Sequence, residues 1–168
     1  MTGIIDRSAM PYRSCVGILV ANQAGKVWVG RRNDAKGILP LGHLWQMPQG
    51  GIDKGEEPWP AAQRELFEET SITSIEPIAE SPDWLTYELP DDILGKALKG
   101  KYRGQKQKWF AVRFTGDDSE IDILNPGDGH PPEFDDWRWA EVDELPGLIV
   151  PFKRPVYESV VAAFRDLV

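Results

Sequence analysis

The sequence is short of the residues and segments that mark several common classes of protein. Cys15 is the only cysteine among 168 residues, which excludes an internal disulfide bond and favours a reducing compartment. No apolar run approaches the roughly 18 residues that span a bilayer, and the first 20 residues lack a secretory signal pattern. We therefore expect a cytoplasmic protein that makes no membrane contact.

Histidine and sequence repetition are scarce as well. His43 and His130 lie apart in loops rich in glycine and proline, so we assign neither of them a metal-binding role. The chain contains no internal repeat, no low-complexity tract and no linker that would separate domains. We expect residues 1–168 to fold as one domain.

Basic residues are outnumbered by acidic ones, and a net charge of −8 is unfavourable for a protein that binds polyanions. However, the segment 96–108 contains six of the 19 basic residues and no acidic residue. Such a segment can attract phosphate groups locally despite the overall sign, and could add weak, salt-sensitive RNA binding. On charge alone, a solvated loop explains it equally well.

Apolar periodicity and turn signals predict a sheet interleaved with two helices. We expect strands at 13–21, 26–31, 74–80, 83–88, 107–115 and 136–141. Pro58 and Pro60 predict the start of a helix that runs to about Thr70. A second helix is expected at 151–168, with its core face formed by Val156, Val160, Val161, Phe164 and Leu167. The expected fold class is α/β (α+β), a mixed β-sheet sandwiched between helices as an α/β/α sandwich.

The first predicted helix gathers acidic residues on one side. Glu65, Glu68 and Glu69 fall within about 100° of one another on a helical wheel. Like charges at this spacing repel one another, and an acidic helix face is usually only a solvated surface. The residues on either side of these glutamates, described next, favour a functional site over a solvated surface.

Read from Gly50, the sequence is GGIDKGEEPWPAAQRELFEETSI, over residues 50–72. This segment resembles the Nudix box, a loop-helix-loop signature of hydrolases that cleave nucleotide phosphoanhydrides with divalent metal. It departs from the pattern at one defining position, because Ser71 stands where the family has glycine. A helix commonly ends there in the left-handed conformation that glycine adopts easily, so we expect Ser71 to cost about 1 kcal/mol of local stability.

The resemblance implies the Nudix fold and a set of metal ligands. It implies that Glu65, Glu68 and Glu69 bind two or three Mg²⁺ ions with a backbone carbonyl near Gly50. It also implies that Glu56 and Arg64 pair to hold the loop against the helix. Magnesium prefers such oxygen ligands and neutralises charge on a phosphoanhydride, although Mn²⁺ or Zn²⁺ could substitute.

Outside the box, the chain resembles the family branch that contains RNA pyrophosphohydrolases and dinucleoside polyphosphate hydrolases. The resembling segments are 12–13, 30–32, 45–51, 83–87, 105–110, 132–139 and 151–154. The resemblance implies that Glu133 supplies a further metal ligand or a base, and that Arg32 and Phe152 hold the base of the first nucleotide between them. Phosphates would be contacted by Arg13, Lys153 and the 105–108 segment, which includes Gln105 and Lys106.

Our hypothesis is that the chain hydrolyses the 5′-triphosphate end of RNA to a 5′-monophosphate. The predicted catalytic residues are Glu65, Glu69 and Glu133, of which Glu69 and Glu133 are candidates to accept the proton of the attacking water. One alternative substrate is a diadenosine polyphosphate, cleaved asymmetrically to ATP and a second nucleotide. Another alternative is a non-catalytic nucleotide or RNA sensor, against which the intact set of glutamates argues.

The sequence contains seven tryptophans, which is a high number for its length. Trp109, Trp137 and Trp139 lie in predicted strands beside apolar residues, so we expect them in the core. Trp84 and Tyr87 are candidates to line the substrate groove.

Overall fold

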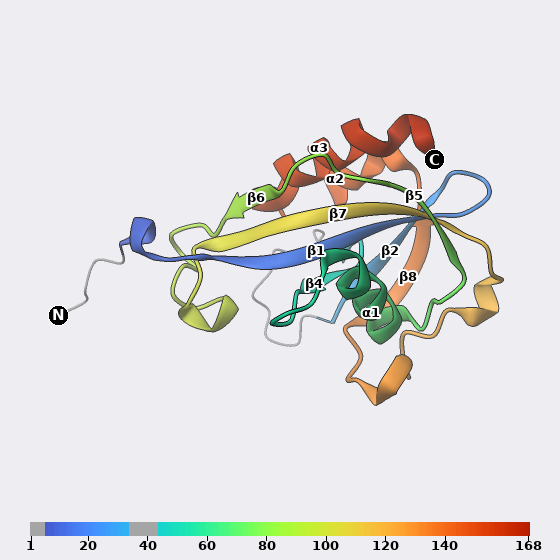
Figure 1. Ribbon diagram of the computed structural model, residues 1–168, viewed down its shortest axis with the longest axis horizontal. Helices are drawn as coiled ribbons and strands as arrows, with labels where there is room; N and C mark the ends of the chain where they lie inside the picture. Colours follow the sequence, from blue (N-terminus) through green and yellow to red (C-terminus); the bar gives the residue numbers. More distant parts are fainter. Residues whose placement is uncertain (1–5, 34–43) are drawn as a thin grey trace.

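The computed structural model describes residues 6–33 and 44–168, which leaves His43 outside the described residues. Figure 1 shows a twisted sheet with one helix on one face and two on the other. The strands are β1 (Tyr12–Ala21), β2 (Val27–Arg32), β3 (Trp45–Gln46), β4 (Gln49–Gly51), β5 (Ile75–Glu80), β6 (Leu85–Glu88), β7 (Gly104–Phe114) and β8 (Phe134–Ala140). The helices are α1 (Pro58–Thr70), α2 (Leu145–Leu148) and α3 (Arg154–Phe164). None of the described helices is long and apolar enough to cross a membrane.

The centre of the sheet is the parallel pair β1 and β7, which are in register from Tyr12↔Gly104 to Ala21↔Arg113. All other strand pairs are antiparallel, so the sheet is mixed as predicted. The other edge of β1 is shared by two strands. β2 pairs with it only at Ala21, and β4 pairs with it from Cys15 to Gly17. This sharing brings β4, which carries Gly50, to the side of helix α1 (Figure 1).

Each face of the sheet has its own hydrophobic core, as expected for an α/β/α sandwich. The α3 side buries Leu19, Met47, Trp109, Leu145, Val160 and Phe164 among others. The α1 side buries Val16, Ile18, Trp28, Leu66, Phe110 and Phe134 among others. Trp109 is fully buried, whereas Trp137 and Trp139 are half-buried against the α1 side.

The glycines of the β1–β4 pair permit unusually close packing against the backbone. A side-chain carbon at Gly17 would overlap the indole ring of Trp109. Gly17 pairs with Gln49, and its neighbour Val16 pairs with Gly50. Glycine is therefore required at position 17 for Trp109 to lie on the strand.

Helix α1 begins and ends where the sequence predicts. Proline occupies its first turn. The N–H group that proline lacks would have no hydrogen-bond partner within the helix at that position, so no helical bond is lost. Ser71 ends the helix in the left-handed conformation with φ 67°, and its N–H donates to the carbonyl of Phe67 at 2.9 Å. The Ser71 hydroxyl donates to the carbonyl of Asp122 at 3.2 Å. The expected left-handed ending is confirmed.

Three details of the prediction are wrong. The C-terminal helix is shorter than 151–168, because 3-10 turns at Pro151–Lys153 and Arg165–Leu167 flank α3. Leu167 lies in the second turn and is 48% exposed, so it is not a core residue. The strand predicted at 83–88 begins only at Leu85, since the Ser81 hydroxyl donates to the carbonyl of Asp83 and closes a bend there.

Candidate active site

Arg64 joins the loop after β4 to helix α1. Its guanidinium donates two hydrogen bonds to the carboxylate of Glu56, at 2.8 and 2.9 Å, and one to the carbonyl of Gly51 at 2.9 Å. Hydrogen bonding to Arg64 lowers the pKa of Glu56 to about 2. The pairing expected of Glu56 and Arg64 is present, and it ties the loop to the second turn of the helix.

The same guanidinium also reaches two further carboxylates. Arg64 Nη1 donates to Glu65 Oε1 at 2.9 Å and to Glu68 Oε2 at 3.1 Å. The other oxygen of Glu68 lies 3.4 Å from Nε2 of His130. One arginine therefore faces three glutamates, and the negative charge around it exceeds the positive charge.

Glu65 packs directly on the backbone of β4. A side-chain carbon at Gly50 would overlap its carboxyl group, so any larger residue there would push the Glu65 carboxyl away from the strand. Burial is the main cause that raises the pKa of Glu65, and the hydrogen bond from Arg64 opposes it.

Glu69 is the most buried of the box glutamates, with 7% of its surface exposed. Burial raises its pKa well above the ordinary value, and the charges of Glu133 and Glu65 raise it further. The backbone N–H of Gln49 donates a hydrogen bond to its carboxylate. Its Oε2 atom is buried and has no hydrogen-bond partner within residues 6–33 and 44–168. A buried carboxylate with a free oxygen is costly unless a proton or a cation meets it.

These observations bear on whether a divalent metal fits the site. Among the described residues, no three His, Cys, Asp or Glu side chains are gathered closely enough to enclose an ion, and Arg64 holds an oxygen of Glu65 and of Glu68. Nevertheless, the free oxygen of Glu69 and the mutual repulsion of Glu65, Glu69 and Glu133 are the properties of an oxygen-rich cation site. The residues present therefore fit a hard divalent cation.

A large cavity of about 470 Å³ adjoins this acidic cluster. Five of the six predicted substrate-binding residues line it: Arg13, Arg32, Gln105, Phe152 and Lys153. Glu133 and Gln49 line it too, and Tyr87 contributes as predicted. Its outer wall is formed by the segment 89–99, through Leu89, Ile93, Lys96, Ala97, Leu98 and Lys99. We call it the large cavity below.

Lys106 and Trp84 do not line the large cavity. Strand β7 alternates its side chains between the two faces of the sheet, so Gln105 and Gln107 are buried while Lys106 points to the opposite face. There its ammonium group lies 5.6 Å from the ring of Trp84, which is 42% exposed.

Lys153 is buried at the inner end of the large cavity. Its ammonium group lies 5.2 Å from the ring of Tyr87 and 6.0 Å from the ring of Phe152. Burial, together with the nearby charge of Arg32, lowers its pKa to about 8. Arg32 Nη2 in turn lies 4.0 Å from Glu133 Oε1. A cluster of cations thus borders the acidic residues across the cavity floor.

The sequence interpretation gave no role to several residues of this site. Gln49 lines the large cavity beside Gly50. Gln107 belongs to the 105–108 segment that was expected to contact phosphates, but it lies behind the large cavity. The two-residue alternation around Lys106 was a signal that could have separated Gln105 and Gln107 from the exposed lysines. Apart from its lysines, the segment 89–99 has no sequence feature that predicts its place in the cavity wall, because its shape depends on tertiary contacts.

The chain belongs to the NUDIX family. A NUDIX domain is matched over residues 11–160. The chain is 59% identical over 158 residues to the RNA pyrophosphohydrolase of Nitrobacter winogradskyi, covering 94% of this chain and 92% of that protein. It is 60% identical over 168 residues to the RNA pyrophosphohydrolase of Brucella anthropi, covering 99% and 97%.

Solved structures of the same fold are more distant in sequence. A C. elegans Ap4A hydrolase binary complex has a TM-score of 0.62 at 21% identity, covering 92% of this chain and 98% of that one. The E. coli dihydroneopterin triphosphate pyrophosphohydrolase has a TM-score of 0.64 at 18% identity, covering 91% and 99%. At these identities the likeness shows a shared fold and carries no information about substrate.

Proposed function

We propose that the chain is an RNA pyrophosphohydrolase, which converts 5′-triphosphate ends to 5′-monophosphates and releases pyrophosphate. The observation that carries this proposal is the position of Glu133. It lines the large cavity, and its charge raises the pKa of the buried Glu69. A phosphate chain bound to the cations of the cavity would therefore end beside the acidic cluster. The close relatives in Nitrobacter and Brucella support RNA as the substrate.

The walls of the large cavity suit a nucleotide end. Phe152 and Arg32 offer an aromatic face and a guanidinium plane for a base, as the sequence predicts. Arg13 and Lys153 offer positive charge for the phosphates. A volume of about 470 Å³ lies within the range of small-molecule sites and admits one nucleotide, so the rest of an RNA would extend past the wall at 89–99.

We infer that Mg²⁺ is held by Glu65, Glu68, Glu69 and Glu133, with the carbonyl of Gly50, and that Mn²⁺ or Zn²⁺ could substitute. When bound, the metal would neutralise charge on the phosphates and activate water. Among the chain's own residues, Glu69 and Glu133 are the candidates to accept the proton of the attacking water. The Oε2 atom of Glu69 is buried and has no hydrogen-bond partner among the described residues, so this oxygen is free to accept a proton.

Cytoplasmic action and a single domain remain part of the proposal. Burial raises the pKa of the Cys15 thiol to about 11, so the only cysteine stays protonated and unreactive. Such a chain is suited to a reducing compartment.

A competition assay tests the proposed substrate. The enzyme receives 5′-triphosphorylated RNA and diadenosine tetraphosphate together with Mg²⁺, and both products are followed. We expect the RNA ends to be converted with the higher kcat/KM, and Glu69→Gln, assayed as the control for contaminating activity, to lose both activities. If the dinucleotide is clearly preferred, the enzyme is a dinucleoside polyphosphate hydrolase and the RNA proposal is wrong.

A further inference from the structure

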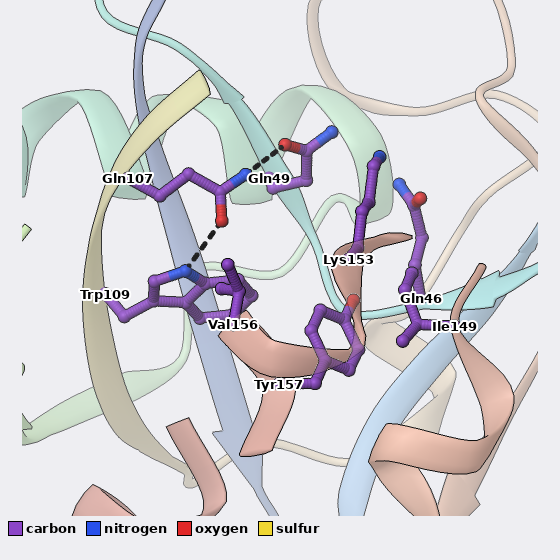
Figure 2. Close-up of a pocket in the computed structure, with 8 residues that line it drawn as sticks. All are labelled: Gln46, Gln49, Gln107, Trp109, Ile149, Lys153, Val156 and Tyr157. Carbon is purple, nitrogen blue, oxygen red and sulfur yellow. Dashed lines mark hydrogen bonds between the residues drawn. The ribbon is translucent and has the colours of Figure 1, made fainter. Parts of the chain in front are cut away.

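A chain of side-chain hydrogen bonds borders the large cavity and starts at a buried indole (Figure 2). Trp109 Nε1 donates to Gln107 Oε1 at 2.8 Å. Gln107 Nε2 then donates to Gln49 Oε1 at 3.1 Å. It also donates to Gln105 Oε1 at 2.7 Å. Trp109 is fully buried, and Gln105 and Gln107 are each 3% exposed. We call Gln49, Gln105 and Gln107 the amide chain.

The direction of every bond in the amide chain follows from the indole. An indole N–H can only donate, so it requires the carbonyl oxygen of Gln107 to face it. The NH₂ group of Gln107 must then point the other way, and its two hydrogens meet Gln49 and Gln105. Both of these glutamines accept through oxygen. Their own NH₂ groups are therefore turned away from Gln107, as Figure 2 shows for Gln49.

The NH₂ groups of Gln49 and Gln105 remain available for a ligand. Both residues line the large cavity, and neither amide nitrogen donates to another of the described residues. Phosphate oxygens only accept hydrogen bonds, so an amide helps to bind phosphate when it presents nitrogen and opposes binding when it presents oxygen. The orientation of these two amides therefore matters for a phosphate chain.

We propose that Trp109 is a positioning residue whose indole N–H fixes the amide chain so that Gln49 and Gln105 both present donors to the phosphates of the substrate. This inference rests on the proposed function, because it requires phosphates in the large cavity. Without the indole donor, Gln107 is free to turn over. Its oxygen would then face Gln49 and Gln105, whose amides would turn inward and leave two carbonyl oxygens facing the phosphates.

The test compares two tryptophans of equal burial. Trp109→Phe removes the donor of the amide chain. Trp28→Phe is the matched control, since Trp28 is also fully buried but its Nε1 has no partner among the described residues. We expect Trp109→Phe to raise KM for 5′-triphosphorylated RNA about tenfold with a smaller change in kcat, because hydrogen bonds to charged groups are lost. Trp28→Phe should change KM less than about twofold, at a comparable loss of thermal stability.

A second variant covers the case in which Trp109→Phe does not fold. Gln107→Glu keeps the indole and its acceptor, but a carboxylate cannot donate to Gln49 and Gln105. Both amides should then turn their NH₂ groups inward, and KM should rise at least as much as in Trp109→Phe. A wild-type KM in folded Gln107→Glu overturns the proposal.

The orientation can also be measured without catalysis, which separates this inference from the proposed substrate. In the wild-type enzyme the side-chain NH₂ protons of Gln49 and Gln105 face the cavity, and NMR should show rapid exchange with water. In Gln107→Glu these NH₂ protons are hydrogen-bonded inside the protein and should exchange slowly, whereas equal exchange rates in the two proteins overturn the proposal.

If the wild-type enzyme cleaves only diadenosine tetraphosphate, the RNA proposal fails and the KM comparison is repeated with that substrate.

Discussion

The carboxylate of Glu65 lies against the Cα of Gly50, with no room between them for a side chain. One residue belongs to helix α1 and the other to strand β4, so this contact sets the distance between the helix that carries the glutamates and the strand that borders the large cavity. Because Gly50 is also paired with Val16 in the sheet, the strand cannot move away without breaking backbone hydrogen bonds, and a side chain at position 50 would displace the Glu65 carboxyl instead.

Gly50→Ala should therefore damage the acidic cluster. The added methyl group overlaps the Glu65 carboxyl, which must move, and a displacement of about 1 Å at a catalytic site lowers activity about 100-fold. Overpacking should lower the free energy of unfolding by about 1–3 kcal/mol. Gly147→Ala is the control, because nothing lies within 4 Å of the new methyl group there. Steady-state kinetics and denaturant unfolding would show the difference, and unchanged activity in Gly50→Ala would contradict the expected role.

The Glu56–Arg64 pair should make stability depend on acid pH. The pKa of Glu56 in the folded protein is about 2, below its ordinary value of 4.5. The folded state therefore binds fewer protons than the unfolded state between these values. The stabilisation is complete above about pH 4.5 and is lost as pH falls towards 2. At pH 3 the wild type should have lost about 2 kcal/mol relative to neutral pH from this group.

Glu56→Gln provides the comparison for that pH dependence. The glutamine does not titrate, so the difference in unfolding free energy between wild type and variant should shrink by about 2 kcal/mol from pH 6 to pH 3. Urea unfolding at both pH values measures it. A difference that stays constant with pH would show that the pair does not contribute in this way.

Ser71→Gly should stabilise the protein. Ser71 has φ 67°, a conformation in which a side chain costs about 1 kcal/mol, and glycine removes that cost. The melting temperature should rise by about 2–4 °C. Ser159→Gly should have the opposite effect, a loss of about 0.5 kcal/mol, because Ser159 is exposed within α3, where glycine is less favourable than serine. Calorimetry on the two variants tests both signs.

Lys153 should make substrate binding weaken at alkaline pH. Its pKa is about 8 because it is buried, so its charge is lost as pH rises through 8. KM for triphosphorylated RNA should therefore rise between pH 7 and pH 9 in the wild-type enzyme. Lys153→Arg keeps its charge throughout and should show a flatter profile. Parallel profiles for the two proteins would mean that the charge of Lys153 does not contribute to binding.

The parts of the site that could be predicted from the sequence are those set by local spacing. Helical spacing placed Glu65, Glu68 and Glu69 on one side of α1. The pairing of Glu56 and Arg64, which the structure shows as a hydrogen bond, was implied by the Nudix resemblance. Arg32 and Phe152 could be assigned to one cavity only through the family resemblance, because nothing local relates residues so far apart.

The parts that could not be predicted depend on the sheet. Gln49 and Gln107 are 58 residues apart and meet only because β4 and β7 both pair with β1. Lys106 was grouped with Gln105 by charge and position, but strand alternation places the two on opposite faces. Leu167 fits the helical period of α3, yet the helix ends at Phe164 and the period no longer applies.

Gly17 and Gly50 of the β1–β4 pair have a consequence for how this enzyme can change over evolution. Gly17 lets the indole of Trp109 touch the sheet from the α3 side, and Gly50 lets the carboxylate of Glu65 touch it from the α1 side. Between a core residue and a residue of the acidic cluster there is therefore only one thickness of peptide backbone. No layer of side chains separates the two residues and could adjust to a substitution on one side. Substitutions in the core around Trp109 and substitutions in the acidic cluster around Glu65 are therefore expected to depend on one another.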